Sequence, residues 1–237
     1  MLGVIGGLGP MATAYFMELV TEMTNAVCDQ AHLPMLIYSA PQIPDRTAFL
    51  LGKSNADPLP GIIHAGCKLK EMGADVLAIP CITAHSFHDA IEAGVGLPTL
   101  HAIRDVAKRL AESDISRVGI MATDGTLQCR LFQNEFEKYG LTAILPDERG
   151  QTAVMDLIYG DIKRGNEPNM DAFHYIKNDL IANGAQIVLL GCTELSLIKR
   201  NHDIGKNVLD ILEVLADSAI RAYKKTVRSD RNIWEFI

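Results

Sequence analysis

Two stretches of the chain, GADVLAIPC at residues 73–81 and GAQIVLLGC at residues 184–192, share one pattern. Each begins with Gly-Ala, continues through a short, mostly apolar run and ends on a cysteine seven residues after the alanine. Short apolar runs bounded by glycine are typical of strands in a parallel sheet that helices cover on both faces. The pattern therefore predicts two equivalent strands, which present Cys81 and Cys192 at their carboxyl ends.

A second pair of similar stretches is LGVIGGLGP at residues 2–10 and VGIMATDGT at residues 118–126. Each has an apolar residue, a glycine, two apolar residues and a glycine-containing turn that leads into a helical pattern. The two pairs are separated by 111 and 116 residues, so they occur in the same order at nearly the same offset. This internal repeat predicts two similar α/β halves.

The rest of the chain alternates between short apolar runs and helical periodicity, which favours parallel βαβ units. We expect strands at Leu2–Gly7, Leu33–Ala40, Asp75–Pro80, Val118–Ala122 and Gln186–Leu190. We expect the main helices at Met11–Asp29, Pro60–Met72, Gly125–Tyr139, Asp171–Asn183 and Val208–Thr226.

The composition is that of an ordinary globular protein, with 48% apolar and 22% charged residues. A net charge of −7 without a clustered basic surface argues against nucleic-acid binding. No apolar run approaches the ~20 residues that span a bilayer, and the apolar N-terminus lacks a basic leader, so we expect a cytoplasmic protein without membrane contact. Five cysteines without a metal-binding spacing predict no metal site.

Two cysteines in equivalent places suit one kind of chemistry. The carboxyl ends of parallel strands are where α/β proteins bind ligands, and a following helix N-terminus stabilises a thiolate. Inversion of a stereocentre needs an acid and a base on opposite faces of one carbon. One thiolate would remove the Cα proton while the other thiol delivers a proton to the opposite face.

Four motifs resemble those of the aspartate/glutamate racemase family over nearly the whole chain. Pro80–His85 reads PCITAH where the family has Pro-Cys-Asn-Thr-Ala-His, and Leu190–Leu195 is similar to its second cysteine motif. Gly6–Thr13 is similar to the glycine signature, and Pro44–Thr47 to the substrate-loop motif. The resemblance implies a cofactor-independent amino-acid racemase that interconverts L- and D-aspartate or glutamate, commonly as a homodimer.

The resemblance also implies an architecture. We expect two pseudo-symmetric Rossmann-like domains, each a parallel sheet of the four-stranded type flanked by helices, with the active-site cleft between them. The first domain would comprise residues 1–98 together with 207–228, and the second residues 99–206.

Roles for single residues follow by the same resemblance. Cys81 and Cys192 match the catalytic pair, and Thr83 and Thr193 match the neighbours that hold the α-carboxylate or amine. Met11 lies in the glycine turn that offers backbone donors, and Thr123 lies in the second copy of that turn. Arg46 matches the arginine that grips the side-chain carboxylate, for which a guanidinium has suitable bidentate geometry, and Lys163 matches an assisting lysine.

One residue departs from the family pattern. Ile82 stands where an asparagine is usual, and it cannot hydrogen-bond the polar head of an amino acid. Three alternatives therefore stay open: an isomerase or racemase of the same fold with another substrate, an amino-acid-binding protein of low activity, and a reaction through a single cysteine.

Other signals are weak. Gly7, Gly9 and Ala12 fit a loose dinucleotide fingerprint, but no acidic residue follows the second strand, so a nicotinamide-dependent oxidoreductase is a remote alternative. His85 and His88 have helical spacing without a third ligand. Glu194 at a helix start is interpreted as a cap that could also tune Cys192. Cys28, Cys67 and Cys129 are expected to be packing residues.

Overall fold

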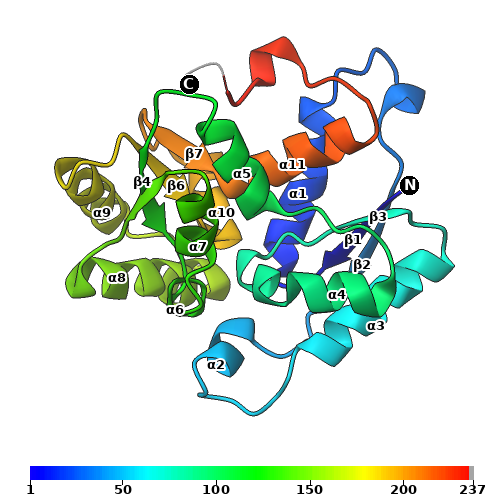
Figure 1. The fold of residues 1–237 in the computed structure, drawn as a ribbon, viewed down its shortest axis with the longest axis horizontal. Coiled ribbons are helices and arrows are strands. Elements are labelled where there is room, and N and C mark those ends of the chain that lie inside the picture. The colour runs from blue at the N-terminus through cyan, green and yellow to red at the C-terminus, as the bar shows by residue number, and fades with distance from the viewer. Residues whose placement is uncertain (235–237) are drawn as a thin grey trace. The chain divides into compact units, whose positions relative to one another are not determined.

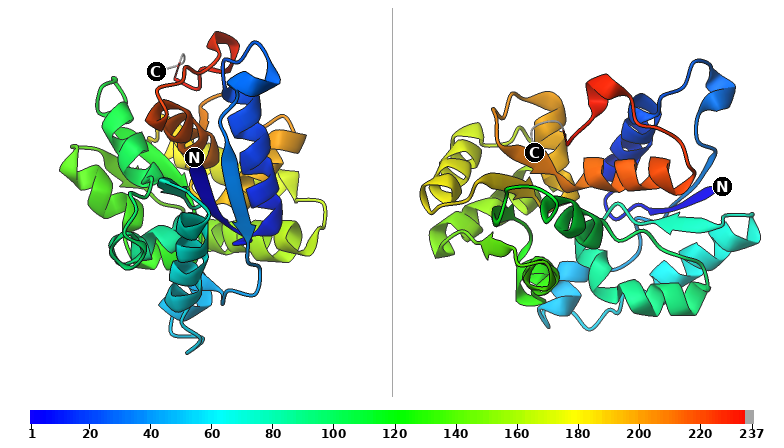
Figure 2. Two further views of the ribbon diagram at one scale, coloured as in Figure 1. Left: turned by 90° about the vertical axis from the view of Figure 1, so that its right-hand side faces the viewer. Right: turned by 45° about the horizontal axis from the view of Figure 1, so that its top comes forward.

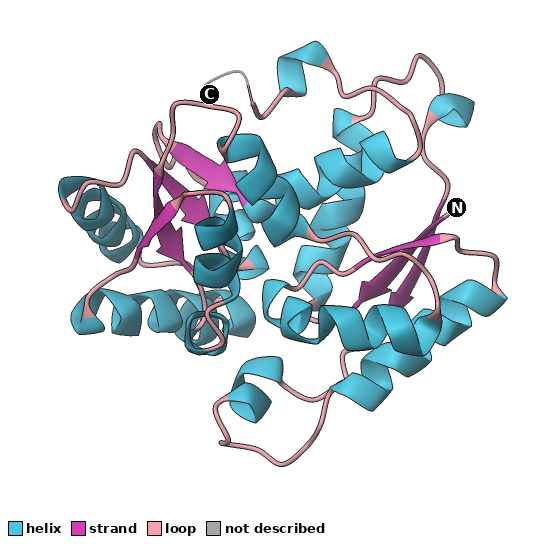
Figure 3. Cartoon of the chain, in the orientation of Figure 1, coloured by secondary structure: helices cyan, strands magenta, loops and turns pink. Residues whose placement is uncertain are grey.

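The structure is a computed structural model that describes residues 1–234. The described chain divides into two compact units, one formed by Met1–Ala102 with residues 212–234, the other by Ile103–Ile211. Each unit contains a parallel sheet flanked by helices, which confirms the expected α/β fold (Figures 1 and 3). Within the described residues, no helix is both long and apolar enough to cross a bilayer.

The sheet of the first unit has the strand order β2-β1-β3, with all strands parallel. The strands are β1 (Leu2–Gly6), β2 (Met35–Ser39) and β3 (Val76–Ala78). All five residues of β1 are buried, which explains why this central strand carries no polar side chain. Beyond β3, Thr99 forms an isolated parallel bridge to Leu77, in the place that a fourth strand would take.

Helices cover both faces of this sheet because side chains of β1 alternate between them. Gly3 and Ile5 face α3, while Gly6 faces α1, beside which α11 lies (Figure 2). The longer helices of this unit are α1 (Pro10–Met23), α3 (Leu59–Glu71), α4 (His88–Val95) and α11 (Ile211–Ala222). The short ones are η1 (Asp29–Ala31), α2 (Arg46–Leu50), η2 (Ile82–Phe87) and η5 (Ser229–Arg231).

The sheet of the second unit has the order β5-β4-β6-β7, again parallel throughout. Its strands are β4 (Arg117–Met121), β5 (Thr142–Ile144), β6 (Ile187–Leu190) and β7 (Val208–Asp210). Its longer helices are α5 (Ala102–Leu110), α7 (Leu131–Lys138), α8 (Glu148–Met155), α9 (Met170–Ala182) and α10 (Thr193–Asn201). Shorter turns of helix are α6 (Asp124–Gln128), the π-helical η3 (Asp156–Asp161) and η4 (Ile162–Arg164).

The two units repeat one another closely. Helix α9 begins and ends 111 residues after α3. Leu2 pairs with Val76 in the first sheet, and Val118 pairs with Ile187 in the second, so the strand register follows the repeat found in the sequence. The cysteine-bearing strands β3 and β6 are therefore equivalent elements.

The repeat extends to the glycine in each central strand. A Cβ atom on Gly3 would lie 2.8 Å from the Cβ of Ala74, and one on Gly119 would lie 3.2 Å from the Cβ of Ala185. Real Cβ atoms rarely approach so closely, so glycine lets the turn between helix and cysteine strand lie against the central strand in both units.

Three helix predictions are wrong at one end or in the middle. The predicted helix Val208–Thr226 begins with β7, because Val208 pairs with Val188 in the sheet. The predicted helix Met11–Asp29 ends at Met23, where Thr24 turns to an extended conformation and bonds back to Val20, which leaves Cys28 exposed. The predicted helix Gly125–Tyr139 is divided into α6 and α7.

The division between α6 and α7 occurs at Arg130, whose φ is +53°. A left-handed residue cannot continue a right-handed helix, so the chain turns there before α7 begins. The side chain of Arg130 ion-pairs with Glu137, nearly two turns into the new helix, at 2.6 Å.

Candidate active site

The two cysteines occupy the same local structure in their respective units. Cys81 follows β3 and precedes η2, and Cys192 follows β6 and precedes α10. In each case the cysteine carbonyl accepts a hydrogen bond from the N–H three residues later, on Ala84 at 3.1 Å and on Leu195 at 3.0 Å. Both residues are buried, with 6% and 5% of their surface exposed. The backbone of each cysteine is thus held at the start of a helical turn, at the carboxyl edge of a parallel sheet.

Cys192 has an acidic neighbour. Its Sγ donates to Glu194 Oε2 at 2.9 Å, and Lys163 Nζ lies 2.8 Å from Glu194 Oε1. Burial raises the pKa of the Cys192 thiol well above its usual range, and the negative charge and hydrogen-bond acceptor of Glu194 raise it further, while Lys163 acts in the opposite direction. Cys192 is therefore held as a neutral thiol in this environment.

Cys81 has a different neighbourhood. Two residues after it stands Thr83, where Cys192 has Glu194. His85, one turn further, is buried and lies beside the rings of His88 and His101, with ring centroids 6.4 and 5.3 Å away. Burial, together with these two imidazoles, lowers the pKa of His85 to about 3, so its ring is neutral at physiological pH.

The histidine pair that the sequence analysis singled out does not form a ligand set. His88 Nε2 lies 2.9 Å from the carbonyl of Thr99, and its Nδ1 lies 3.1 Å from Asp89. Among the described residues, no group of three His, Cys, Asp or Glu side chains is placed to hold a metal ion. His88 is thus hydrogen-bonded, and His85 is packed against neighbouring rings, within their own unit.

The glycine turn after β1 leads directly into α1. Gly7 has a φ of +87° and donates its N–H to Thr13 Oγ1 at 2.9 Å. A Cβ on Gly7 would overlap the backbone of Ala40, so only glycine fits. Pro10 and Met11 are the first two residues of α1, and the first N–H groups of a helix have no partner within it. Met11 therefore stands where backbone donors are available, and its side chain is 59% exposed.

Arg46 is buried and ties its own loop to this turn. Its Nη2 donates to the carbonyl of Leu8 at 2.8 Å, and its Nη1 donates to the carbonyls of Ile43 and Pro44 at 3.2 and 2.9 Å. Asp45 begins α2 by accepting from the N–H of Ala48 at 2.7 Å. The substrate-loop motif is thus anchored beside the glycine turn of the same unit.

The second copy of the turn is capped by a threonine. Thr123 is buried and begins α6, and its Oγ1 lies 3.0 Å from Thr126 Oγ1. Because β4 and β6 are neighbours, Thr123 and Cys192 follow adjacent strands at the same edge of the sheet. Thr193, 1% exposed, is the first residue of α10.

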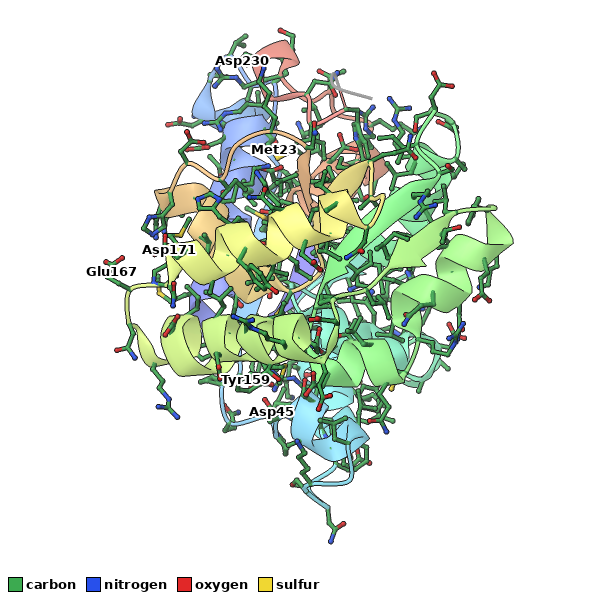
Figure 4. The ribbon with its side chains drawn as sticks, turned by 90° about the vertical axis from the view of Figure 1, so that its left-hand side faces the viewer. Met23, Asp45, Tyr159, Glu167, Asp171 and Asp230 are labelled. Carbon is green, nitrogen blue, oxygen red and sulfur yellow. The ribbon has the colours of Figure 1, made fainter. Side chains whose placement is uncertain are left out.

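Lys163 reaches Glu194 from a distorted helix. After α8 the chain winds through the π-helical η3 and the short η4, which ends at Gly165 with a φ of +73°. Figure 4 labels Tyr159 on this segment, and Lys163 Nζ lies 5.1 Å from the centroid of its ring. Local π-helical turns are frequent at functional sites, and this one directs Lys163 toward α10.

Within the second unit, Glu194 joins three predicted site residues. Its carboxylate contacts Cys192 and Lys163, and Thr193 Oγ1 lies 3.5 Å from Oε2. From the sequence alone, Glu194 is expected mainly to cap a helix. The signal for its contact with the thiol was its spacing, two residues after a cysteine at a helix start.

Comparison with known proteins decides the family. The family model described as Asp/Glu/Hydantoin racemase matches residues 5–219. The chain belongs to this family. Membership of the Asp/Glu/hydantoin racemase family identifies a racemase and indicates an isomerase that acts on amino acids.

Individual relatives agree over nearly full length. The chain is 26% identical to a broad specificity amino-acid racemase, RacX, of Bacillus subtilis, across 94% of this chain and 98% of the relative. It is similar to the structure of an aspartate racemase from Picrophilus torridus, with a TM-score of 0.85, 27% identity and coverage of 99% and 98%. A putative Asp/Glu racemase from Yersinia pestis matches with a TM-score of 0.75, 25% identity and coverage of 93% and 97%.

Proposed function

We propose that this racemase interconverts the L- and D-forms of aspartate or glutamate by proton transfer at Cα between Cys81 and Cys192. The observation that carries the proposal is the equivalence of the two cysteines. Each is buried at the end of a corresponding strand, before a helical turn, in one of two repeated units. An aspartate racemase among the similar structures supports an acidic substrate.

The proposed reaction needs one thiolate and one thiol. The thiolate takes the Cα proton and forms an S–H bond, and the electron pair of the broken C–H bond remains on the substrate. The other thiol gives its proton to the opposite face of Cα and becomes a thiolate. The product is the mirror-image amino acid, and the reverse reaction exchanges the two roles.

The remaining site residues are proposed to hold the substrate. Backbone and hydroxyl donors at Met11, Thr83, Thr123 and Thr193 would bind the α-carboxylate and amine. These residues follow neighbouring strands within their sheets, where ligands of α/β proteins bind. Arg46, aided by Lys163, would bind the side-chain carboxylate, since a guanidinium matches a carboxylate with two parallel hydrogen bonds.

A second candidate is a racemase of the same mechanism with a broader or different amino-acid substrate. Ile82, 2% exposed and directly after Cys81, favours it, because an apolar side chain stands where the family usually has an amide. The relative from Bacillus subtilis, described as having broad specificity, points the same way.

We further propose that the reaction needs no cofactor and that the enzyme acts in the cytoplasm as a homodimer. Two thiols supply both the acid and the base, so no electron-withdrawing group is needed to complete the proton transfers. Light scattering of the purified protein tests the dimer, and activity after exhaustive dialysis tests the absence of a cofactor.

The test of function is incubation with single L-amino acids in deuterated water. L-Aspartate or L-glutamate should form the D-isomer with deuterium at Cα, and a panel of neutral amino acids reports the breadth of specificity. Exchange of neutral substrates alone would favour the second candidate. Binding detected by thermal shift, without exchange for any substrate, would overturn both.

A further inference from the structure

The carboxylate of Glu194 connects a thiol to a cation inside the second unit. Oε2 accepts the Cys192 S–H at 2.9 Å, and Oε1 lies 2.8 Å from Lys163 Nζ. The Glu194 side chain is 7% exposed and that of Lys163 is 26% exposed. A hydrogen bond to a carboxylate fixes the direction of the S–H, and the ion pair to Lys163 fixes the carboxylate in turn.

The corresponding position beside Cys81 has no such group. Glu194 lies 111 residues after Thr83, which is the offset that relates the two cysteines, so the repeat places a threonine where the second unit has a carboxylate. The two copies are therefore alike in backbone and different in charge. This difference is a property of the chain itself, whichever substrate is used.

We propose that Glu194 is a positioning residue that holds Cys192 as the resting thiol, with Lys163 anchoring its carboxylate. Cys192 is then the proton donor of the resting enzyme, and Cys81 is the group that accepts the Cα proton. The statement about the thiol is independent of any reaction, while the donor role rests on the proposed function. In the first half-reaction the Cα–H proton forms an S–H bond on Cys81, and the S–H proton of Cys192 forms the new Cα–H bond.

The charges of Glu194 and Lys163 are expected to shift the pKa of the Cys192 thiol in opposite directions, so two variants should behave oppositely. In Glu194→Gln the thiolate of Cys192 loses a negative neighbour and keeps a positive one, so its pKa falls and more thiolate is present at neutral pH. In Lys163→Met the thiolate loses its positive neighbour, so its pKa rises and less thiolate is present. Since only the thiolate attacks, the modification rate changes about tenfold for each pKa unit.

The experiment measures the modification of each cysteine by methyl methanethiosulfonate between pH 6 and 9, in the absence of substrate, by peptide mass spectrometry. Cys192 should react at least about tenfold faster at neutral pH in Glu194→Gln and more slowly than wild type in Lys163→Met. Cys81 should keep its wild-type rate in both variants. Glu135→Gln is the matched control, because Glu135 is a similarly buried acid of the same unit, 2.6 Å from Lys138, and should leave Cys192 unchanged.

Equal rates at Cys192 in wild type and Glu194→Gln would overturn the proposal, as would acceleration in both variants, which indicates loosened packing rather than charge. If Glu194→Gln does not fold, Lys163→Met still tests the effect of charge on the Cys192 thiol, because Lys163 is partly exposed and its substitution disturbs the packing less. Because no substrate is present, this outcome is separate from that of the racemisation assay. An unchanged Cys192 in an active racemase would reject only the role of Glu194.

Discussion

The guanidinium of Arg46 donates to the carbonyl oxygen of Leu8 at 2.8 Å, which ties the substrate-loop motif to the glycine turn of the first unit. Arg46→Ala removes this tie together with the proposed grip on a side-chain carboxylate. We expect kcat/KM for aspartate and glutamate to fall by roughly 10²-fold or more, the loss of ~3 kcal/mol that a charge-assisted hydrogen bond contributes. Short apolar amino acids, assayed in parallel, should lose far less, and an equal loss for both kinds of substrate would argue against the grip.

The two cysteines are each expected to be indispensable. Cys81→Ser and Cys192→Ser should each lower racemisation by roughly 10²–10⁴-fold, the range for a lost general acid or base, because a hydroxyl is a far weaker acid than a thiol. The controls are Cys67→Ser and Cys129→Ser, which replace partly buried cysteines of the first and second unit and should retain activity. A normal rate in either catalytic variant would remove that cysteine from the mechanism.

Ile82 is expected to limit the recognition of acidic substrates. Ile82→Asn restores an amide next to Cys81, and one added hydrogen bond of ~1–2 kcal/mol should raise kcat/KM for aspartate or glutamate by roughly 5- to 30-fold. Ile82→Leu keeps an apolar side chain of the same volume and should show no such gain. Identical kinetics for all three proteins would mean that residue 82 does not contact the substrate.

His85 should make the first unit sensitive to acid. Its pKa is lowered to about 3 in the folded protein and returns to an ordinary value on unfolding, so the unfolded chain binds more protons between these two values. Its contribution to stability is therefore present above about pH 6.5 and is lost as the pH falls toward 3, by on the order of 5 kcal/mol in total.

Urea titrations at pH 7, 5.5 and 4.5 measure this contribution. The loss of stability between pH 7 and 4.5 should be smaller in His85→Leu than in the wild type, whatever the absolute stability of the variant. His64→Leu, at an exposed position of the same unit, serves as the control and should follow the wild type. Parallel curves for all three would show that His85 does not set the acid sensitivity.

Alanine substitutions at Gly7 and Gly52 distinguish the energetic cost of backbone strain from that of a steric overlap. Both have positive φ values, +87° and +67°, so alanine at either position costs ~1–2 kcal/mol of conformational energy. A Cβ at Gly52 would meet nothing within 4 Å, whereas one at Gly7 would overlap the backbone of Ala40. Gly7→Ala should therefore lower the unfolding free energy by ~1–3 kcal/mol more than Gly52→Ala does, and its urea midpoint should be lower. Similar midpoints for the two variants would contradict the steric overlap with the backbone of Ala40.

The repeat in the sequence was sufficient to predict the two parallel sheets, because the glycines that bound each strand are required by backbone geometry. Gly73 and Gly184 have φ values of +99° and +94° at the ends of equivalent helices, where few other residues fit. A glycine at such a position marks the end of a helix and can be recognised from the sequence alone.

Other elements left no comparable signal. Strand β5 has only three residues and lies partly buried at the sheet edge, so it is too short for its sequence to be distinguished from a loop. Strand β7 runs directly into α11, and a continuous apolar stretch does not distinguish a buried strand from a buried helix. Arg130 adopts a left-handed conformation that could not be predicted, because arginine has no preference for it.

The candidate site, too, could be predicted only in part from the sequence. Its cysteines and threonines could be named from motifs, since these residues stand next to strand ends. The contact from Lys163 to Glu194 joins residues 31 positions apart in the sequence, through a π-helical segment whose winding is set by tertiary packing. Pairings of this kind depend on side-chain geometry that no local pattern encodes.

The second unit is continuous in sequence, whereas the first is completed by the segment that begins at Leu212. During synthesis the ribosome therefore delivers every residue of the inner unit before it delivers α11. The first unit stays incomplete until α11, which lies beside α1 (Figure 2), has been synthesised. Co-translational assembly of the two units therefore has a preferred order, in which the second unit can fold before the first unit receives α11.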